Sequence, residues 1–107
     1  MLNQQSKYQL LKSLDQNSNL TQRQLSKELG ISLGKVNYCL QSLIQVGFVK
    51  VHNFKNSNDK LQYSYLLTPK GVAEKTKLTI MFLKAKTEEY QALKKEVEKI
   101  ANEETDK

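Results

Sequence analysis

Four polar residues lie close together in the chain, at a spacing that suits the reading of nucleic-acid bases: Lys35, Asn37, Tyr38 and Gln41. The amides of Asn37 and Gln41 have the paired donor and acceptor that match adenine in the major groove, and Lys35 suits a guanine edge or a phosphate. The ring of Tyr38 suits a thymine methyl group or a phosphate. The set therefore predicts contact with double-stranded DNA. The alternative for each residue is an ordinary exposed side chain.

Small residues come just before this set. Ser32 and Gly34, with Leu33 between them, would let the start of a helix sink into the major groove. A glycine inside a helix costs roughly 0.5–1 kcal/mol relative to alanine, and close approach to DNA is one reason to keep Gly34. Arg23 and Lys27, on the preceding segment, are candidate phosphate contacts.

Catalytic and metal-binding chemistry is poorly supported. His52 is the only histidine and Cys39 the only cysteine, which excludes a His-paired or cysteine zinc site and a disulfide within one chain. Asp15, Glu28 and Asp59 are scattered and form no acid–base pair. We expect His52 to be a polar strand residue and Cys39 a buried structural thiol rather than a redox sensor. The sequence thus predicts no enzyme, no metal and no cofactor.

The elements that must position the polar set form a helix-turn-helix pattern. Residues 6–16 are expected to form a first helix. Thr21, with Gln24 three residues later, is a capping box that starts a second helix, and Gly30 ends it where a left-handed residue is needed. The third helix ends at Gly47, and its inward side is expected from apolar residues at helical spacing: Val36, Leu40, Leu43 and Ile44.

The pattern changes to strands between residues 48 and 67. FVKVHNF and LQYSYLL are rich in β-branched and aromatic residues, and KNSNDK between them is polar and turn-forming. We expect this hairpin to be a wing that packs on the helices, with Val49 and Val51 as inward anchors. Phosphate or minor-groove contacts are predicted near its tip, and the alternative is a solvated turn; the candidates are Lys55, Asn56 and Lys60.

One long helix is expected from Pro69 onward. Proline suits a first helical position, and about 35 residues at 1.5 Å each would span roughly 50 Å. That length exceeds what a domain of this size can cover, so a partner helix from a second copy is expected; a long solvated helix is the alternative. The orientation of the pair stays open, and its expected contacts are Ile80, Leu83, Tyr90, Leu93, Val97 and Ile100.

Length and charge divide the chain into two parts. Its 107 residues carry a net charge of +6, which fits one small domain and an extension. Residues 1–68, the expected winged helix-turn-helix domain, hold a net +5, whereas residues 69–107, the dimerisation arm, hold +1. The positive charge therefore lies where a polyanion is expected. No apolar run is long enough for a membrane span or a signal peptide, so we expect a cytoplasmic protein.

The strings GISLGKVNYCL, NFKNS and LLTPKG, within residues 20–93, resemble the MarR-type winged-helix regulators of bacteria, and more narrowly a short subgroup associated with exopolysaccharide gene clusters. The resemblance implies a homodimeric transcription regulator that reads DNA through residues 32–41 and makes wing contacts near residues 56–60. Typical full-length members have further helical segments that build the dimer and often a ligand pocket. This chain has a short N-terminal part and one long helix instead, which leaves any effector unknown.

The sequence therefore predicts a mostly α fold with a small β-wing, followed by a long C-terminal helix. The expected function is sequence-specific DNA binding by a homodimer on a pseudo-palindromic operator. The alternative is a winged-helix protein-interaction module without sequence-specific DNA binding. The charge of the winged part favours DNA.

Overall fold

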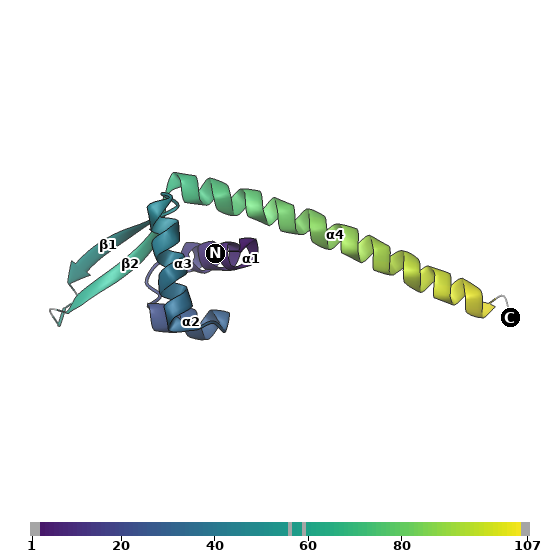
Figure 1. The fold of residues 1–107 in the computed structure, drawn as a ribbon, viewed down its shortest axis with the longest axis horizontal. Helices are drawn as coiled ribbons and strands as arrows, with labels where there is room; N and C mark the ends of the chain where they lie inside the picture. Colours follow the sequence, from purple (N-terminus) through teal and green to yellow (C-terminus); the bar gives the residue numbers. More distant parts are fainter. Residues whose placement is uncertain (1–2, 56, 59, 106–107) are drawn as a thin grey trace.

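A computed structural model describes residues 3–55, 57–58 and 60–105. It confirms a mostly helical winged helix-turn-helix with a two-stranded antiparallel wing and a long C-terminal helix (Figure 1). The elements in chain order are α1 (Gln4–Gln16), α2 (Gln22–Leu29), α3 (Leu33–Gln45), β1 (Val49–Lys55), β2 (Leu61–Leu67) and α4 (Pro69–Thr105).

The helix boundaries follow the expected capping chemistry. The Thr21 hydroxyl accepts the backbone N–H of Gln24 at 3.1 Å, and the Gln24 side chain accepts the N–H of Thr21 at 2.8 Å. At α3 the Ser32 hydroxyl alone caps the helix, by accepting the N–H of Lys35, and Gly30 ends α2 in a left-handed conformation with φ of 67°. Each cap satisfies backbone groups that a helix end leaves without partners, so the turn between α2 and α3 is fixed by local sequence.

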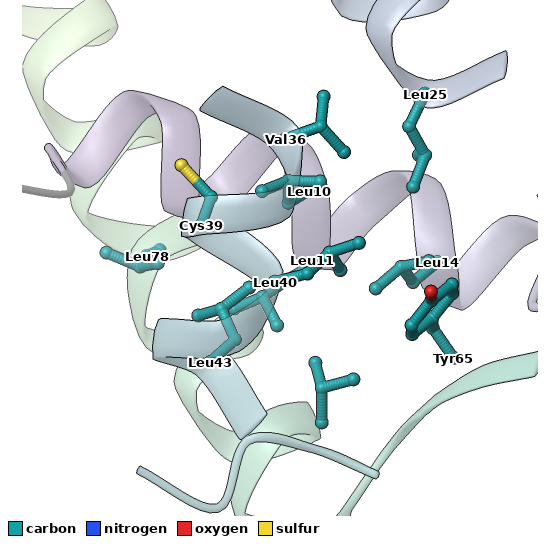
Figure 2. Packing of buried hydrophobic residues seen from close by; sticks show 11 residues of the cluster. Leu10, Leu11, Leu14, Leu25, Val36, Cys39, Leu40, Leu43, Tyr65 and Leu78 are labelled. Carbon is teal, nitrogen blue, oxygen red and sulfur yellow. The ribbon is translucent and has the colours of Figure 1, made fainter. Parts of the chain in front are cut away.

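The core lies where α1, α3 and the start of α4 meet. Figure 2 shows Leu10 and Leu11 of α1 lying among side chains of α3, and Leu14 of α1 beside Tyr65 of β2. Leu25 of α2 lies at one edge of the cluster. Leu78 reaches the cluster from α4 (Figure 2). The buried apolar residues are Leu10, Leu11, Leu14, Leu25, Val36, Cys39, Leu40, Leu43, Val49, Tyr65 and Leu78. One face of α3 therefore packs in the core, and its opposite face is exposed to solvent.

The wing is anchored only at its base. Val49 pairs with Leu67 and is 2% exposed, as expected. Val51, in contrast, is 40% exposed, so the expectation that it anchors the wing is wrong. It pairs with Tyr65 and shares the face of Val49, but β1 is covered by the helices only near its start. A backbone hydrogen bond of 3.0 Å from the N–H of Tyr65 to the carbonyl of Ser18 ties β2 to the α1–α2 loop.

A tight junction joins the base of the wing to α4. The backbone of Gly71 lies so close to the backbone carbonyl of Phe48 that a Cβ there would clash. The Thr68 hydroxyl accepts the N–H of Gly71 at 3.1 Å and donates to the carbonyl of Gly47. The Thr68 N–H donates to the carbonyl of Phe48 at 3.0 Å. The direction in which α4 leaves the domain is therefore fixed at its first turn.

Contacts with α1 hold only the first part of α4. Lys7 and Glu74 form an ion pair at 3.3 Å, and Lys75 and Asp15 form one at 2.6 Å. The rings of Tyr8 and Phe82 pack with centroids 5.3 Å apart. From residue 83 to 105 every residue of α4 is exposed, and the helix extends far beyond the rest of the chain (Figure 1). Among the described residues, no helix combines the length and apolar character needed to cross a membrane.

Candidate nucleic-acid interface

Helix α3 presents one polar face to solvent. Successive residues of an α-helix are about 100° apart around the axis, so residues two positions apart lie on nearly opposite sides. Gly34, Tyr38 and Gln41 each precede a buried residue by two positions; these buried residues are Val36, Leu40 and Leu43. Gly34, Tyr38 and Gln41 therefore form the centre of the exposed face of α3. Lys35 and Asn37 are also exposed and lie on its two flanks.

The first turn of α3 is shaped for close approach. The Ser32 hydroxyl accepts the N–H of Lys35 at 3.1 Å, which starts the helix immediately before Leu33. An added Cβ at Gly34 would have no atom of this chain within 4 Å. Packing within the chain therefore gives no reason for glycine at this position. A surface that comes close from outside would give one.

A hollow of about 790 Å³ lies between α3, the start of α2 and the wing. Gln41 of the exposed face of α3 and Lys60 at the end of the wing turn both line this hollow. Most of its other lining side chains are polar; they come from Asn19, Thr21, Gln22, Gln24 and Gln62, with Leu61, Tyr63 and Tyr65 of β2. The site is thus a mostly polar hollow with α3 and the start of α2 on one side and the wing hairpin on the other. Figure 1 shows how α3 and the wing are arranged.

A second hollow, of about 380 Å³, joins α2 to the first residue of α3. It is lined by Arg23, Ser26, Lys27 and Leu33. Both basic residues are exposed. Arginine and lysine are frequent phosphate contacts in protein–DNA interfaces, so the structure keeps Arg23 and Lys27 as candidates for that role.

The structure leaves every described candidate accessible. The exposed candidates are Ser32, Leu33, Gly34, Lys35, Asn37, Tyr38 and Gln41 around α3, Arg23 on α2, and Lys55 and Lys60 on the wing. Asn56, the remaining wing candidate, lies outside the described residues, as does Asp59. Their contacts with DNA stay predictions, because exposure permits contact without demonstrating it.

Tyr63 is a residue that sequence reasoning missed. It pairs with Asn53 across the hairpin, is 48% exposed and lines the larger hollow. Tyr63 lies on the same face of β2 as the buried Tyr65 but farther from the base of the wing. The missing signal was distance along the hairpin, since the inner face is covered only near the base. An aromatic side chain there is available for contact with a sugar or a phosphate.

Cys39 lies buried in the core, and His52 lies exposed on a strand of the wing. Burial raises the pKa of the Cys39 thiol, and the nearby Lys35 opposes that shift only in part. The thiol therefore stays protonated within the core, as expected for a structural cysteine. His52 is exposed on β1 and stacks on the ring of Phe54, with centroids 6.0 Å apart. Within residues 3–55, 57–58 and 60–105, no group of three or more His, Cys, Asp or Glu side chains could hold a metal ion.

Comparison with known proteins agrees with this geometry. A family described as "Winged helix-turn-helix DNA-binding" matches residues 4–50, which run from the start of α1 into β1. The adhesin competence repressor AdcR of Streptococcus pyogenes is 22% identical, with a TM-score of 0.66 over 89% of this chain and 67% of that one. No curated protein matches the chain.

Two similar structures contain DNA. A mutant MarR of E. coli complexed with operator DNA is 27% identical, with a TM-score of 0.56 over 68% of this chain and 51% of that one. FabT of Streptococcus pneumoniae in complex with DNA is 25% identical, with a TM-score of 0.57 over 78% of this chain and 57% of that one. The chain thus spans about half to two-thirds of the length of these three proteins. These two likenesses and the family match agree on a winged helix-turn-helix fold.

Proposed function

We propose that this chain is a sequence-specific DNA-binding transcription regulator that acts as a homodimer on a pseudo-palindromic operator. The observation that carries the proposal is the exposed face of α3, where a glycine with open space around it stands beside Tyr38 and Gln41. The opposite face of the helix is fully engaged in the core. The exposed face of α3 can therefore bind a partner without any loss of packing in the core.

The two hollows suggest how a duplex lies on the protein. With α3 in the major groove, the larger hollow between α3 and the wing would receive one sugar–phosphate strand, and Lys60 and Tyr63 would flank it. The smaller hollow would place Arg23 and Lys27 beside the phosphates of the other groove edge. The net charge of +5 on residues 1–68 supports this placement, because DNA attracts a basic surface.

Selection of bound sequences from a random duplex library, at near-physiological salt, tests the proposal. We expect an enriched motif with two-fold symmetry and half-sites about one helical turn apart, or a multiple of that. The affinity should fall by about 0.9 log units per log unit of salt for each phosphate neutralised. Bulk binding without any enriched motif would contradict sequence-specific reading and favour the protein-interaction alternative.

A triple variant tests the assignment of the reading face. Lys35→Ala, Tyr38→Ala and Gln41→Ala together should abolish the sequence preference while leaving the fold intact, because all three side chains are exposed. Lys84→Ala is the matched control, since it removes one exposed positive charge from α4 far from α3. If the triple variant still selects the wild-type motif, another surface reads the DNA.

The resemblance of GISLGKVNYCL, NFKNS and LLTPKG to the exopolysaccharide-associated subgroup supports a narrower role. We infer that the regulated genes include exopolysaccharide genes and that the protein acts in the bacterial cytoplasm, where its operator lies. The selected motif should then occur upstream of such genes in the source genome. Its absence from those promoters would refute this narrower role without affecting DNA binding.

A further inference from the structure

The outer part of α4 carries a stripe of apolar side chains that nothing in the chain covers. Leu83, Tyr90, Leu93 and Val97 are each more than 60% exposed, and Ile100 is 48% exposed. They are spaced by alternating steps of three and four residues, with Lys86 at the one omitted position. This is the a and d pattern of a coiled coil, in which Leu83, Tyr90 and Val97 take a positions.

The pattern continues toward the winged domain through two threonines. Thr79 and Thr76 take the preceding d and a positions, and their hydroxyls donate to the carbonyls of Lys75 and Val72 at 2.7 and 3.1 Å. Because these donors are satisfied within the helix, the threonine methyl groups can be buried without loss of a hydrogen bond. The stripe therefore runs from residue 76 to 100, roughly three and a half heptads, which is long enough for a coiled coil.

Helix α1 lies beside the first part of the stripe only. Phe82, which packs on Tyr8, flanks the stripe, because it lies about 40° from Lys86 around the helix. Lys86 and Glu89 face a hollow of about 660 Å³ that α1 also lines, and no described residue of α4 beyond Glu89 lines this hollow. From Tyr90 to Ile100 a second helix can therefore lie along the stripe while α1 keeps its place.

Charges beside the stripe distinguish the two possible orientations. From residue 89 onward the g positions are Glu89, Glu96 and Glu103, whereas the preceding g position is Phe82, which packs on α1. Lys94 is the charged residue at an e position. In a parallel pair in register, each g residue faces the e residue five positions later on the other helix, so Glu89 faces Lys94 twice. The geometry points to a parallel, in-register coiled coil between the α4 stripes of two copies of this chain.

The antiparallel alternative is disfavoured by the same residues. Antiparallel pairing places g positions opposite g positions, and every g position from residue 89 onward is a glutamate. In the register that aligns Leu83 with Ile100, for example, Glu89 would face Glu96 on both sides. Each such pair is repulsive, and no glutamate–lysine pair between e and g positions replaces it.

Lys86 is the one residue of the stripe that opposes close parallel pairing, because it would face its own copy. Its ammonium lies 3.5 Å from the carboxylate of Glu89 on the same helix, and the side chain is 77% exposed. The long stem of lysine can leave the charge in water while its methylenes cover the neighbouring apolar residues. A single lysine in a coiled-coil core lowers stability but helps to specify one register.

A parallel arm would place both winged domains at the same end of the coiled coil. This consequence rests on the proposed function, because two recognition helices at one end can bind neighbouring half-sites. Residues 88–107 carry a net charge of −3, so the far end of the arm would be repelled by the duplex. Charge distribution along α4 thus agrees with an arm that points away from DNA.

Disulfide cross-linking under mild oxidation separates the orientations. Ile100→Cys should cross-link to its own copy only if the helices are parallel, because antiparallel helices place residue 100 near residue 83. A mixture of Ile100→Cys and Leu83→Cys chains should therefore give no mixed disulfide. Wild-type protein is the control, since its Cys39 is buried. A mixed 83–100 disulfide, or a dimer with neither cross-link, would overturn the proposal.

Charge reversal supplies an independent readout. Lys94→Glu alone should weaken the dimer roughly tenfold in sedimentation equilibrium, and adding Glu89→Lys should restore most of the affinity. If Glu89→Lys alone strengthens the dimer, the helices are antiparallel. A mass of one chain at tens of micromolar would overturn the coiled coil altogether. That result would leave the reading of a single half-site by α3 intact, so the two proposals fail separately.

Discussion

The two halves of α4 place the same residue types in opposite situations. Leu78 in the first half is 1% exposed, whereas Leu93 in the second half is 66% exposed. Both lie on one uninterrupted helix from Pro69 to Thr105. The difference comes from α1, which lies along the first half and supplies Tyr8 and two ion-pair partners. A hollow lined by both helices separates α1 from α4 as far as Glu89, and beyond Glu89 no other described element lies opposite α4.

The comparison shows that apolar spacing along a helix does not reveal what covers it. The first half of α4 contributes Leu78 to the core of the winged domain. The second half carries a regular apolar stripe that no described residue of the chain covers. Burial therefore has to be measured separately for each half.

The largest difference in stability between the two halves is expected from truncating Leu78 and Leu93. Leu78→Ala should lower the free energy of unfolding by about 2–5 kcal/mol, because it opens a cavity in a filled core. Leu93→Ala should leave the stability of the monomer almost unchanged and weaken self-association instead. Urea unfolding at several protein concentrations measures both effects.

The concentration series is the control for this pair. For Leu78→Ala the loss should persist at every concentration, whereas for Leu93→Ala it should vanish at dilutions at which the wild type is monomeric. If Leu93→Ala destabilises the diluted chain as much as Leu78→Ala does, the two halves are not energetically distinct.

A smaller effect is expected at the junction that sets the direction of α4. Gly71→Ala places a methyl group against the backbone carbonyl of Phe48, which cannot move away as a flexible side chain would. We expect a loss of about 1–3 kcal/mol in thermal or urea unfolding, as for other overpacked sites. An unchanged midpoint would mean that α4 can shift relative to the wing.

Gly34→Ala should act with the opposite sign on stability. Its Cβ would meet no atom of the chain, so the variant should gain up to about 1 kcal/mol from better helix propensity. Its affinity for the selected operator should nevertheless fall, because the methyl group lies at the centre of the exposed face of α3. Unfolding and fluorescence anisotropy on the same preparation check both parts. A variant that is more stable and binds equally well would remove Gly34 from the interface.

Local chemistry explains why much of the fold could be predicted. The capping residues Thr21 and Ser32 and the left-handed Gly30 act within a few residues of sequence, and the structure confirms all three. The exposure of Val51 and Tyr63 could not be predicted in this way. It depends on how far the helices reach along the wing, which is a property of tertiary packing. The hollow that joins Gln41 to Lys60 is likewise set by long-range packing.

The smallest effects should come from the ion pairs that hold α1 on the first half of α4. The side chains of Lys75 and Asp15 are 26% and 45% exposed, whereas those of Lys7 and Glu74 are 19% and 13% exposed. Because water screens exposed charges, a double-mutant cycle on Lys75 and Asp15 should give a coupling of only about 0.2–1 kcal/mol, which decreases in high salt. The cycle on Lys7 and Glu74 should give a larger coupling that salt changes less.

The cycle is needed for Lys7 because its ammonium also lies 5.7 Å from the ring centroid of Phe48, and single substitutions would lose both contacts. Equal couplings for the two pairs would show that the α1–α4 contact is as open to water as the second half of the helix, and the contrast between the halves would then rest on apolar packing alone.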